Sequence, residues 1–597
     1  VLIPIVFVLP AWKHRAITAF TFAVAIAIGI TPLLLPVILS SSLSKGAVRM
    51  SKKKTIVKKL DSIQNFGAMN ILCTDKTGTL TEDKIVLEKY LNIKGEEDLR
   101  VLKHAFLNAF FQTGLKGNID EAVIKRGIEN GLGNFRETYK KVDEIPFDFA
   151  RRRLSVIVSD GAKKQMITKG AVEEILNICT LVDNNGQVEP ITKSIKDNIR
   201  KISRKLNEDG LRVVAVCQKN DILQNETFDV SDEKNMVLLG FIGFLDPPKE
   251  SAKESIKKLN QVGIRVIVLT GDNAEVTKCI CSKVGINSNK IVLGTQLDKL
   301  SDAAVLRLLK KTNIFAKLSP IQKARIVRLL KDAGNIVGYM GDGINDSPSL
   351  TNSDVGISVD TAVDIAKESA DIILLEKDLN VLLDGVSEGR RTFVNLMKYI
   401  KLATSFNFGE VMSVIIASAL LPFLPETPIQ LLVEGLLYDF GQMTLPFDHV
   451  DKEDLQKPKK LDIKSLKHFM FFWGPLSSCF DMVVFACLWF FFNIREAALF
   501  QTIWFSYSIV SNLVGMHIIR TAKLPFIQSN AHRAVYISSI SLIIIGILVP
   551  FTGLGAMIGL VPMQFSDIVL IFGVTFLYCI VAIFAKKVYL KKYKEWI

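Results

Sequence analysis

The stretch Cys73-Thr74-Asp75-Lys76-Thr77-Gly78-Thr79-Leu80-Thr81 places an acid at the end of a short apolar run that begins at Met69. Such a run predicts a buried strand, and the small polar residues after it predict a turn. A carboxylate on this turn, followed by Thr and Gly residues whose amides can point at an anion, suits an aspartyl nucleophile that accepts a phosphoryl group. An ordinary aspartate turn is the alternative interpretation, so the rest of the chain has to decide between the two.

Two further apolar runs end in the same kind of turn. The runs 265–270 and 335–340 lead into Gly271-Asp272 and Gly341-Asp342. Amphipathic helices are expected between the strands, most clearly over 320–333. Strand, turn and helix in alternation predict an α/β fold with a doubly wound parallel sheet, whose functional site lies at the carboxyl ends of the strands.

Between residues 91 and 239 the pattern changes to alternating strands. Examples are the segments 153–160 and 164–169, which are joined by a turn at Gly161. Short strands with alternating apolar residues predict an antiparallel sheet rather than a parallel one. We therefore expect residues 91–239 to form a separate α+β domain that is inserted into the first.

The composition indicates a membrane part joined to a soluble part. The chain has 597 residues, of which 49% are apolar and 22% are charged. This mixture excludes one small fold and a disordered chain. A net charge of +14 could suggest a nucleic-acid partner, but Lys and Arg are concentrated beside hydrophobic stretches. There they orient helices against an anionic leaflet, so we expect membrane lipid and no nucleic acid as partners.

Hydrophobic stretches of spanning length flank the soluble part. One covers 16–43, and six more lie near 394–424, 427–447, 469–493, 497–519, 534–560 and 565–585. With a shorter run at the start, they predict an all-α membrane bundle of about seven complete transmembrane helices, formed by residues 1–44 and 392–597. Lys and Arg favour alternate loops. This predicts a multi-pass protein of the cell (inner) membrane with its soluble domains in the cytoplasm.

The three turns resemble, in order, the motifs of P-type ATPases. The stretch from Asp75 to Thr81 resembles the phosphorylation signature of this family, and Thr270-Gly271-Asp272-Asn273 resembles its phosphate-contacting turn. The stretch Gly341-Asp342-Gly343-Ile344-Asn345-Asp346-Ser347-Pro348 resembles its hinge and Mg²⁺ motif. The resemblance implies a haloacid-dehalogenase-like phosphorylation domain at 45–90 and 240–391, with ATP and Mg²⁺ as cofactors.

The resemblance also implies a role for each motif residue. Asp342 and Asp346 are four residues apart and could aim at one hard cation. By resemblance, Asp75, the carbonyl of Thr77 and Asp342 hold Mg²⁺, while Lys323 and Thr270 neutralise the transferred group. Thr77 cannot act as an acid or base, so the acyl phosphate is expected to persist. The expected catalytic residues are Asp75, Thr77, Thr270, Gly271, Asp272, Lys323 and Asn345, and the expected Mg²⁺ ligands are Asp75, Thr77, Asp342 and Asp346.

The inserted domain carries an aromatic residue and several cations near strand ends. An aromatic face for adenine with cations for the phosphates would form an ATP site, although plain packing and solvated charge would give the same pattern. The resemblance favours a nucleotide-binding domain at 91–239. The expected nucleotide-binding residues are Asp120, Phe147, Arg152, Lys169, Gly170 and Arg212.

The membrane part resembles the magnesium-transporting bacterial branch of the family, with departures. The prolines of Thr31-Pro32-Leu33-Leu34-Leu35-Pro36 free carbonyls in mid-membrane, but this stretch lacks the carboxylate usual in that branch. Glu410 instead replaces an Asn, and intramembrane acids are functional candidates. Glu434, about 140° around the helix from Asp439, is expected to face elsewhere. The expected ligands of the transported ion are Ile28, Pro32, Asn407, Glu410 and Asp439.

Together these features predict ATP-driven transport of a divalent cation, Mg²⁺ by resemblance, through an aspartyl phosphate. The family's Thr-Gly-Glu actuator loop does not occur in the sequence. We therefore expect a C-terminal part of a longer pump that does not complete the cycle alone, with a separate N-terminal half as a candidate partner. Two alternatives stay open: a membrane-anchored ATP-binding or regulatory remnant without transport, and a pump of another divalent cation.

Overall fold

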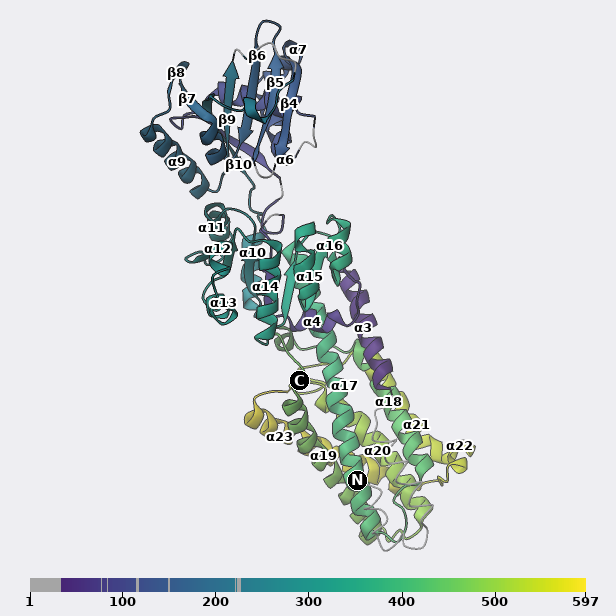
Figure 1. Cartoon of the computed structure of the whole chain (residues 1–597). Helices are drawn as coiled ribbons and strands as arrows, with labels where there is room; N and C mark the ends of the chain where they lie inside the picture. The colour runs from purple at the N-terminus through teal and green to yellow at the C-terminus, as the bar shows by residue number, and fades with distance from the viewer. Residues whose placement is uncertain are drawn as a thin grey trace. The chain divides into compact units, whose positions relative to one another are not determined.

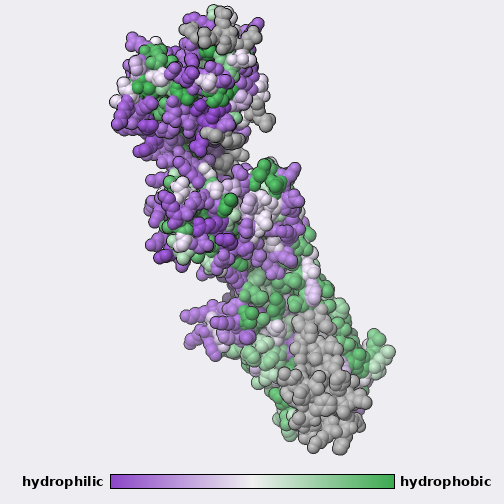
Figure 2. Space-filling model, in the orientation of Figure 1, coloured by the Kyte–Doolittle hydropathy of each residue, from purple (hydrophilic) through white to green (hydrophobic). Residues whose placement is uncertain are grey.

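The computed structural model describes residues 34–596 except 77, 83, 114–116, 149–150, 221 and 223–226 (Figure 1). The chain divides into two compact units. We call residues 1–69 with 384–597 the helical unit, and residues 70–383 the α/β unit. Figure 2 shows hydrophobic surface over the helical unit and mostly hydrophilic surface over the α/β unit.

A parallel sheet brings the three sequence motifs of the α/β unit together. At its centre β2 (Ile71–Thr74) lies between β11 (Arg265–Leu269) and β14 (Val337–Met340), and both pairings are parallel. The strands of this sheet within the unit run in the order β16-β15-β14-β2-β11-β13-β12. The expected α/β character is confirmed, while the haloacid-dehalogenase-like assignment stays a prediction. The outer strands are β12 (Ile291–Leu293), β13 (Ile314–Ala316), β15 (Val355–Val359) and β16 (Ile372–Leu374).

Helices follow the strands of this sheet as the sequence predicts. All four residues of β2 are buried, as expected for a central strand that is covered on both faces. The helix α14 (Pro320–Asp332) is capped by Ser319, carries Pro320 in its first turn and is followed by Gly334 with a positive φ of 83°. The other helices after β11 are α11 (Ala274–Lys283), α12 (Gly294–Leu297), α13 (Asp302–Leu309), α15 (Ser347–Asn352) and α16 (Asp364–Ser369), and α10 (Ala252–Gln261) precedes β11.

The second sheet of the α/β unit is mainly antiparallel, with the order β4-β5-β6-β9-β10-β7-β8 and β3 paired to β10. The strands β3 and β10 cross the predicted domain boundaries at 90/91 and 239/240, so both belong to this sheet rather than to the parallel one. Its strands are β3 (Val86–Asn92), β4 (Lys140–Asp148), β5 (Arg153–Ser159), β6 (Lys164–Gly170), β7 (Cys179–Asn184), β8 (Gln187–Pro190), β9 (Arg212–Asn220) and β10 (Met236–Leu245), and its helices include α5 (Leu99–Phe111), α6 (Asn118–Glu129), α8 (Val172–Ile178) and α9 (Lys193–Glu208).

The helical unit contains, among the described residues, five helices that are long and apolar enough to cross a membrane. Their outward side chains are apolar: Phe565 is 80% exposed and Phe576 is 69% exposed. This is what a lipid-facing surface requires. The five are α17 (Leu379–Leu420), α19 (Ile463–Ala486, continued to Phe491), α20 (Ala497–Ile519), α21 (Arg533–Leu548, continued to Phe551) and α23 (Phe565–Tyr593).

The predicted count of about seven spanning helices is therefore not confirmed. The stretch 427–447 forms α18 (Pro428–Gln442), which has only 15 residues, whereas a span needs about 20. Thr427 caps its start, and a 3₁₀ turn at Leu445–Phe447 follows its end. The helix α3 (Leu35–Ser51) carries Pro36 in its first turn, and residues 1–33 lie outside the described residues.

One buried carboxylate gives a stability test of the inserted sheet. Glu233 is 3% exposed and accepts from Arg151 Nη1 at 2.9 Å, Arg153 Nε at 2.6 Å and Ser155 Oγ at 2.7 Å. Replacing Glu233 with Gln leaves two guanidinium groups without their counter-charge, so we expect a loss of about 3 kcal/mol in stability. Amide hydrogen exchange in β5 should become roughly 100-fold faster.

The control is Glu254→Gln, which breaks an exposed pair with Lys258 in the same unit. Exposed pairs contribute little, so this variant should exchange like the wild type. Unchanged exchange in Glu233→Gln would contradict the prediction.

Candidate active site and nucleotide cavity

The ammonium group of Lys323 joins two acids at the centre of the parallel sheet. Lys323 lies on α14 and is 4% exposed. Its Nζ is 2.6 Å from Oδ2 of Asp75 and 3.0 Å from Oδ1 of Asp346. The phenol of Tyr339, in β14, donates to the same Oδ1 of Asp346 at 2.6 Å. The turns after β2 and β14 therefore meet at one cation.

Burial and charge work against each other at this site. Burial raises the pKa of Asp75, the Lys323 ammonium lowers it, and the nearby Asp346 raises it again, so that the pKa lies above its usual range. Burial alone would lower the pKa of Lys323, but Asp75 and Asp346 outweigh it, and this pKa lies above its usual value. Lys323 thus stays charged and compensates the acids around it.

A second lysine connects the turn after β2 to the turn after β11. The backbone N–H of Lys76 donates to Oδ1 of Asp75 at 2.6 Å, and its Nζ lies 2.7 Å from Asp272 and 3.8 Å from Asp246. The hydroxyl of Thr81 donates to Asp246 at 2.6 Å. The Lys323 ammonium and the backbone N–H of Lys76 therefore both contact Asp75, and donors of this kind can stabilise an incoming phosphoryl group.

The residues expected to hold Mg²⁺ offer the right donors. The carboxylate of Asp342 contacts the ammonium of Lys377, and a Cβ at Gly78 would collide with that same ammonium. A cation is therefore already accommodated beside Asp342 and the turn after Asp75. Carboxylate oxygens are the ligands that Mg²⁺ prefers, so Asp75 and Asp342 fit this ion.

The other predicted catalytic residues have different environments. Thr270 is 1% exposed, and its hydroxyl accepts from the backbone N–H of Asp272 at 3.2 Å. Gly271 lies between them in the turn, and Asn345 is exposed. Asp346 faces Lys323 and Tyr339, so its role as a Mg²⁺ ligand stays a prediction. Thr77 lies outside the described residues.

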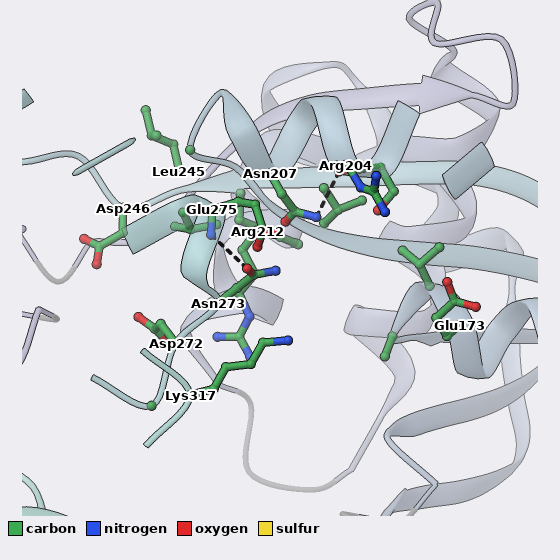
Figure 3. Close-up of a pocket in the computed structure, with 18 of the residues that line it drawn as sticks. Glu173, Arg204, Asn207, Arg212, Leu245, Asp246, Asp272, Asn273, Glu275 and Lys317 are labelled. Atoms are coloured by element: carbon green, nitrogen blue, oxygen red, sulfur yellow. Dashed lines mark hydrogen bonds between the residues drawn. The ribbon is translucent and has the colours of Figure 1, made fainter. Parts of the chain in front are cut away.

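A cavity of about 720 Å³ opens beside the turn after β11. Figure 3 shows Arg212 and Lys317 near Asp272 and Asn273, with Glu173 at the other side. Of the predicted nucleotide-binding residues, Arg152 and Arg212 line this cavity. Its further cations, which the sequence analysis did not select, are Lys76, Arg200, Arg204 and Lys317. Cationic side chains gathered around a cavity suit a phosphorylated ligand.

The remaining predicted nucleotide-binding residues are not among those that line the cavity. Lys169 forms a buried ion pair with Asp120, which also accepts from Nε2 of Gln112 at 2.7 Å. Phe147 is 51% exposed, as an aromatic face for a base would need to be. A Cβ at Gly170 would lie 2.6 Å from Cβ of Arg153, so the two strands approach closely there. The role of these four residues stays a prediction.

In the helical unit the structure groups acids differently from the sequence analysis. The carboxylate oxygens of Glu410, Glu426 and Glu434 lie within 4.8 Å of one another. Sequence reasoning set Glu434 aside, although an acid inside an apolar stretch was the available signal, and missed Glu426, which lies between two predicted stretches. Asn407 and Asp439 are half-buried and lie outside this group, and Ile28 and Pro32 lie outside the described residues.

Two family models match the chain. One, described as P-type ATPase, cytoplasmic domain N, covers residues 105–251. The other, described as cation transporting ATPase, C-terminus, covers residues 423–588. The first match covers most of the inserted sheet and the segment that leads from β10 to α10. The second match begins in the loop before α18 and ends within α23.

Full-length relatives carry the same assignment. The chain is 48% identical over 552 residues to the Magnesium-transporting ATPase, P-type 1, of Escherichia coli K12, covering 92% of this chain and 62% of that protein. It is 44% identical over 604 residues to a protein of the same name from Salmonella typhimurium LT2, covering 100% of this chain and 66% of the relative. It is 31% identical to Calcium-transporting ATPase 1 of Bacillus cereus over 75% of this chain and 53% of the relative.

The chain thus spans less than two thirds of the length of these relatives. Lys323 joins the turns after β2 and β14, Lys76 joins the turn after β2 to the turn after β11, and the similarity extends over both units. The chain belongs to the P-type ATPase family.

Proposed function

We propose that the chain is the phosphorylated and membrane-embedded part of an ATP-driven Mg²⁺ transporter. The observation that carries this proposal is the meeting of Asp75, Lys323 and Asp346 at the carboxyl ends of two adjacent parallel strands. The names of the most similar relatives support Mg²⁺ as the transported ion. The concentration of Lys and Arg in alternate loops supports an orientation with the α/β unit in the cytoplasm of the cell.

The proposed chemistry is the transfer of the γ-phosphoryl group of ATP to Asp75. A carboxylate oxygen of Asp75 attacks the γ-phosphorus, the bond to the bridging oxygen breaks, and ADP leaves with that oxygen. Bound Mg²⁺ supplies further charge neutralisation, with Asp75 and Asp342 as its protein ligands. The Lys323 ammonium and the backbone N–H of Lys76 already contact Asp75, so little reorganisation of charge is needed at the moment of transfer.

The cavity beside Asp272 is the proposed place for the phosphates of the nucleotide. Arg152 and Arg212 come from the inserted sheet, and Asp272 and Asn273 come from the turn after β11. The cavity thus adjoins the turn that Lys76 connects to Asp75. A nucleotide held by these cations would have its terminal phosphate near the proposed nucleophile.

The nucleophile is tested by labelling with γ-labelled ATP and Mg²⁺. We expect an acid-stable, hydroxylamine-labile adduct, as an acyl phosphate gives, and Asp75→Asn should abolish it because an amide does not attack phosphorus in this way. The control Asp364→Asn changes a fully exposed acid of the same unit and should label like the wild type. A label that survives in Asp75→Asn would contradict the assignment.

The cavity is tested by calorimetric titration with ATP. Arg212→Gln removes one cation from the lining, and we expect the Kd to rise roughly 10-fold, since a charge-assisted hydrogen bond contributes about 1.5 kcal/mol. Lys163→Gln removes one positive charge from the exposed turn between β5 and β6 and should leave the Kd unchanged. Equal affinity in Arg212→Gln and the wild type would place the phosphates elsewhere.

A further inference from the structure

Three acids from three successive elements of the helical unit converge on one point. Glu410 lies within α17, Glu426 lies in the loop after it, and Glu434 lies on the second turn of α18. Their carboxylate oxygens are no more than 4.8 Å apart. Glu426 is 0% exposed and Glu434 is 2% exposed.

The loop that carries Glu426 is fastened at both ends. The carbonyl of Leu424 accepts from Nε2 of Gln501, on α20, at 2.8 Å. The helix α18 begins at Pro428, two residues after Glu426. Thr427 caps this helix, because its hydroxyl accepts from the backbone N–H of Gln430. These contacts explain why a charged side chain in a loop points inward rather than to the surface.

The negative charge of the cluster has no compensation within the described residues. The charged groups that act on the three glutamates there are one another and Asp481, which lies on α19. No Lys or Arg is among these groups. Uncompensated carboxylates inside a protein are very costly, so such a cluster has to hold protons or a cation.

The unpaired oxygens show that the occupant, whether a proton or a cation, has to lie between the carboxylates themselves. In the part of the chain that the structure describes, no hydroxyl, amide or ammonium donor reaches either oxygen of Glu426 or Oε1 of Glu434. By contrast, the nearby Asp481 accepts from the hydroxyl of Ser413 at 2.5 Å. Buried carboxylate oxygens are normally hydrogen-bonded, so oxygens that face each other without donors need a shared proton or a metal ion between them.

The spacing suits a hard divalent cation. Ligand oxygens on opposite sides of such an ion are separated by about 4.2 Å for Mg²⁺ and about 4.8 Å for Ca²⁺, twice the ion-to-oxygen distances. The span of at most 4.8 Å lies at this scale. Two of the three carboxylates already balance the charge of a divalent ion without Asp439.

We propose that Glu410, Glu426 and Glu434 form a binding site for one hard divalent cation, a site that does not include Asp439. The site deepens the proposed function, because it adds Glu426 and Glu434 to Glu410, which the sequence analysis names as a ligand of the transported ion. The proposed role of this site in transport rests on the proposed function. Binding of the cation to the site does not, because binding requires no ATP.

The test counts bound Mn²⁺ by electron paramagnetic resonance on the purified chain in lipid nanodiscs without nucleotide. Mn²⁺ is the probe because it shares the oxygen ligands of Mg²⁺. We expect the wild type to bind one more tight Mn²⁺ than Glu426→Gln/Glu434→Gln, and excess Mg²⁺ to displace it. Glu426→Gln alone should raise the Kd at least 10-fold, and Glu426→Asp, which keeps the charge, should raise it less.

The matched control is Glu496→Gln, an exposed acid of the same unit, which should bind like the wild type. Elution as a single species and phosphorylation of Asp75 by ATP report whether each variant is folded. If the double variant is not folded, the single variants Glu410→Gln and Glu434→Gln replace it in the comparison of Mn²⁺ counts with the wild type. Equal Mn²⁺ counts in a folded double variant and the wild type would overturn the site and assign the cluster to protons. Absence of Asp75 labelling in the wild type, with the difference in Mn²⁺ intact, would overturn the proposed function instead.

Discussion

The contact of one ammonium group with two carboxylates organises the α/β unit. Lys323 reaches Asp75 from α14 and at the same time reaches Asp346 after β14. Because all of these groups are buried or nearly so, removal of the lysine would leave two acids without compensation. The adjacent parallel strands β2 and β14 bring the turns after them to this cation, and Lys76 connects the turn after β2 to the turn after the next strand, β11. The fold therefore places the proposed nucleophile, Asp75, against its counter-charge, and Lys76 links its turn to Asp272.

The acids at the centre of the α/β unit and the glutamate cluster of the helical unit differ in their compensation, although the helical unit also holds a compensated buried acid, Asp448, which pairs with Lys398 and Arg520. In the α/β unit each central acid has a lysine: Asp75 has Lys323, Asp272 has Lys76, and Asp342 has Lys377. In the helical unit, the cluster of Glu410, Glu426 and Glu434 has no such partner among the described residues. Ammonium groups at a site favour the binding of an anion, and unpaired carboxylates favour the binding of a cation. This difference matches the chemistry that a cation pump driven by ATP has to perform in its two parts.

Much of the α/β unit could be predicted from the sequence because its signals are local. An apolar run before an Asp-bearing turn gives β2, and Ser319 with Pro320 gives the start of α14. The partners of Lys323 and Lys377 depend on which strands become neighbours, which no local pattern contains. The length of α18 was misjudged because hydrophobicity continues past Gln442, while the helix ends there and a 3₁₀ turn follows. Glu426 was missed because an acid between two prolines is typical of an exposed surface loop. The contact of Leu424 with Gln501, which holds this loop against α20, is not visible in the sequence.

The central claim is that Asp75 receives a phosphoryl group between Lys323 and a Mg²⁺ ion held by Asp342. The most direct measurement is a cryo-electron microscopy structure of the chain with Mg²⁺ and beryllium fluoride, which mimics an aspartyl phosphate. The account predicts the fluoride group on the carboxylate of Asp75, with Lys323 in contact with it and Asp342 turned from Lys377 to the metal ion. A structure in which Asp75 stays paired with Lys323 and the beryllium fluoride is bound elsewhere would contradict it.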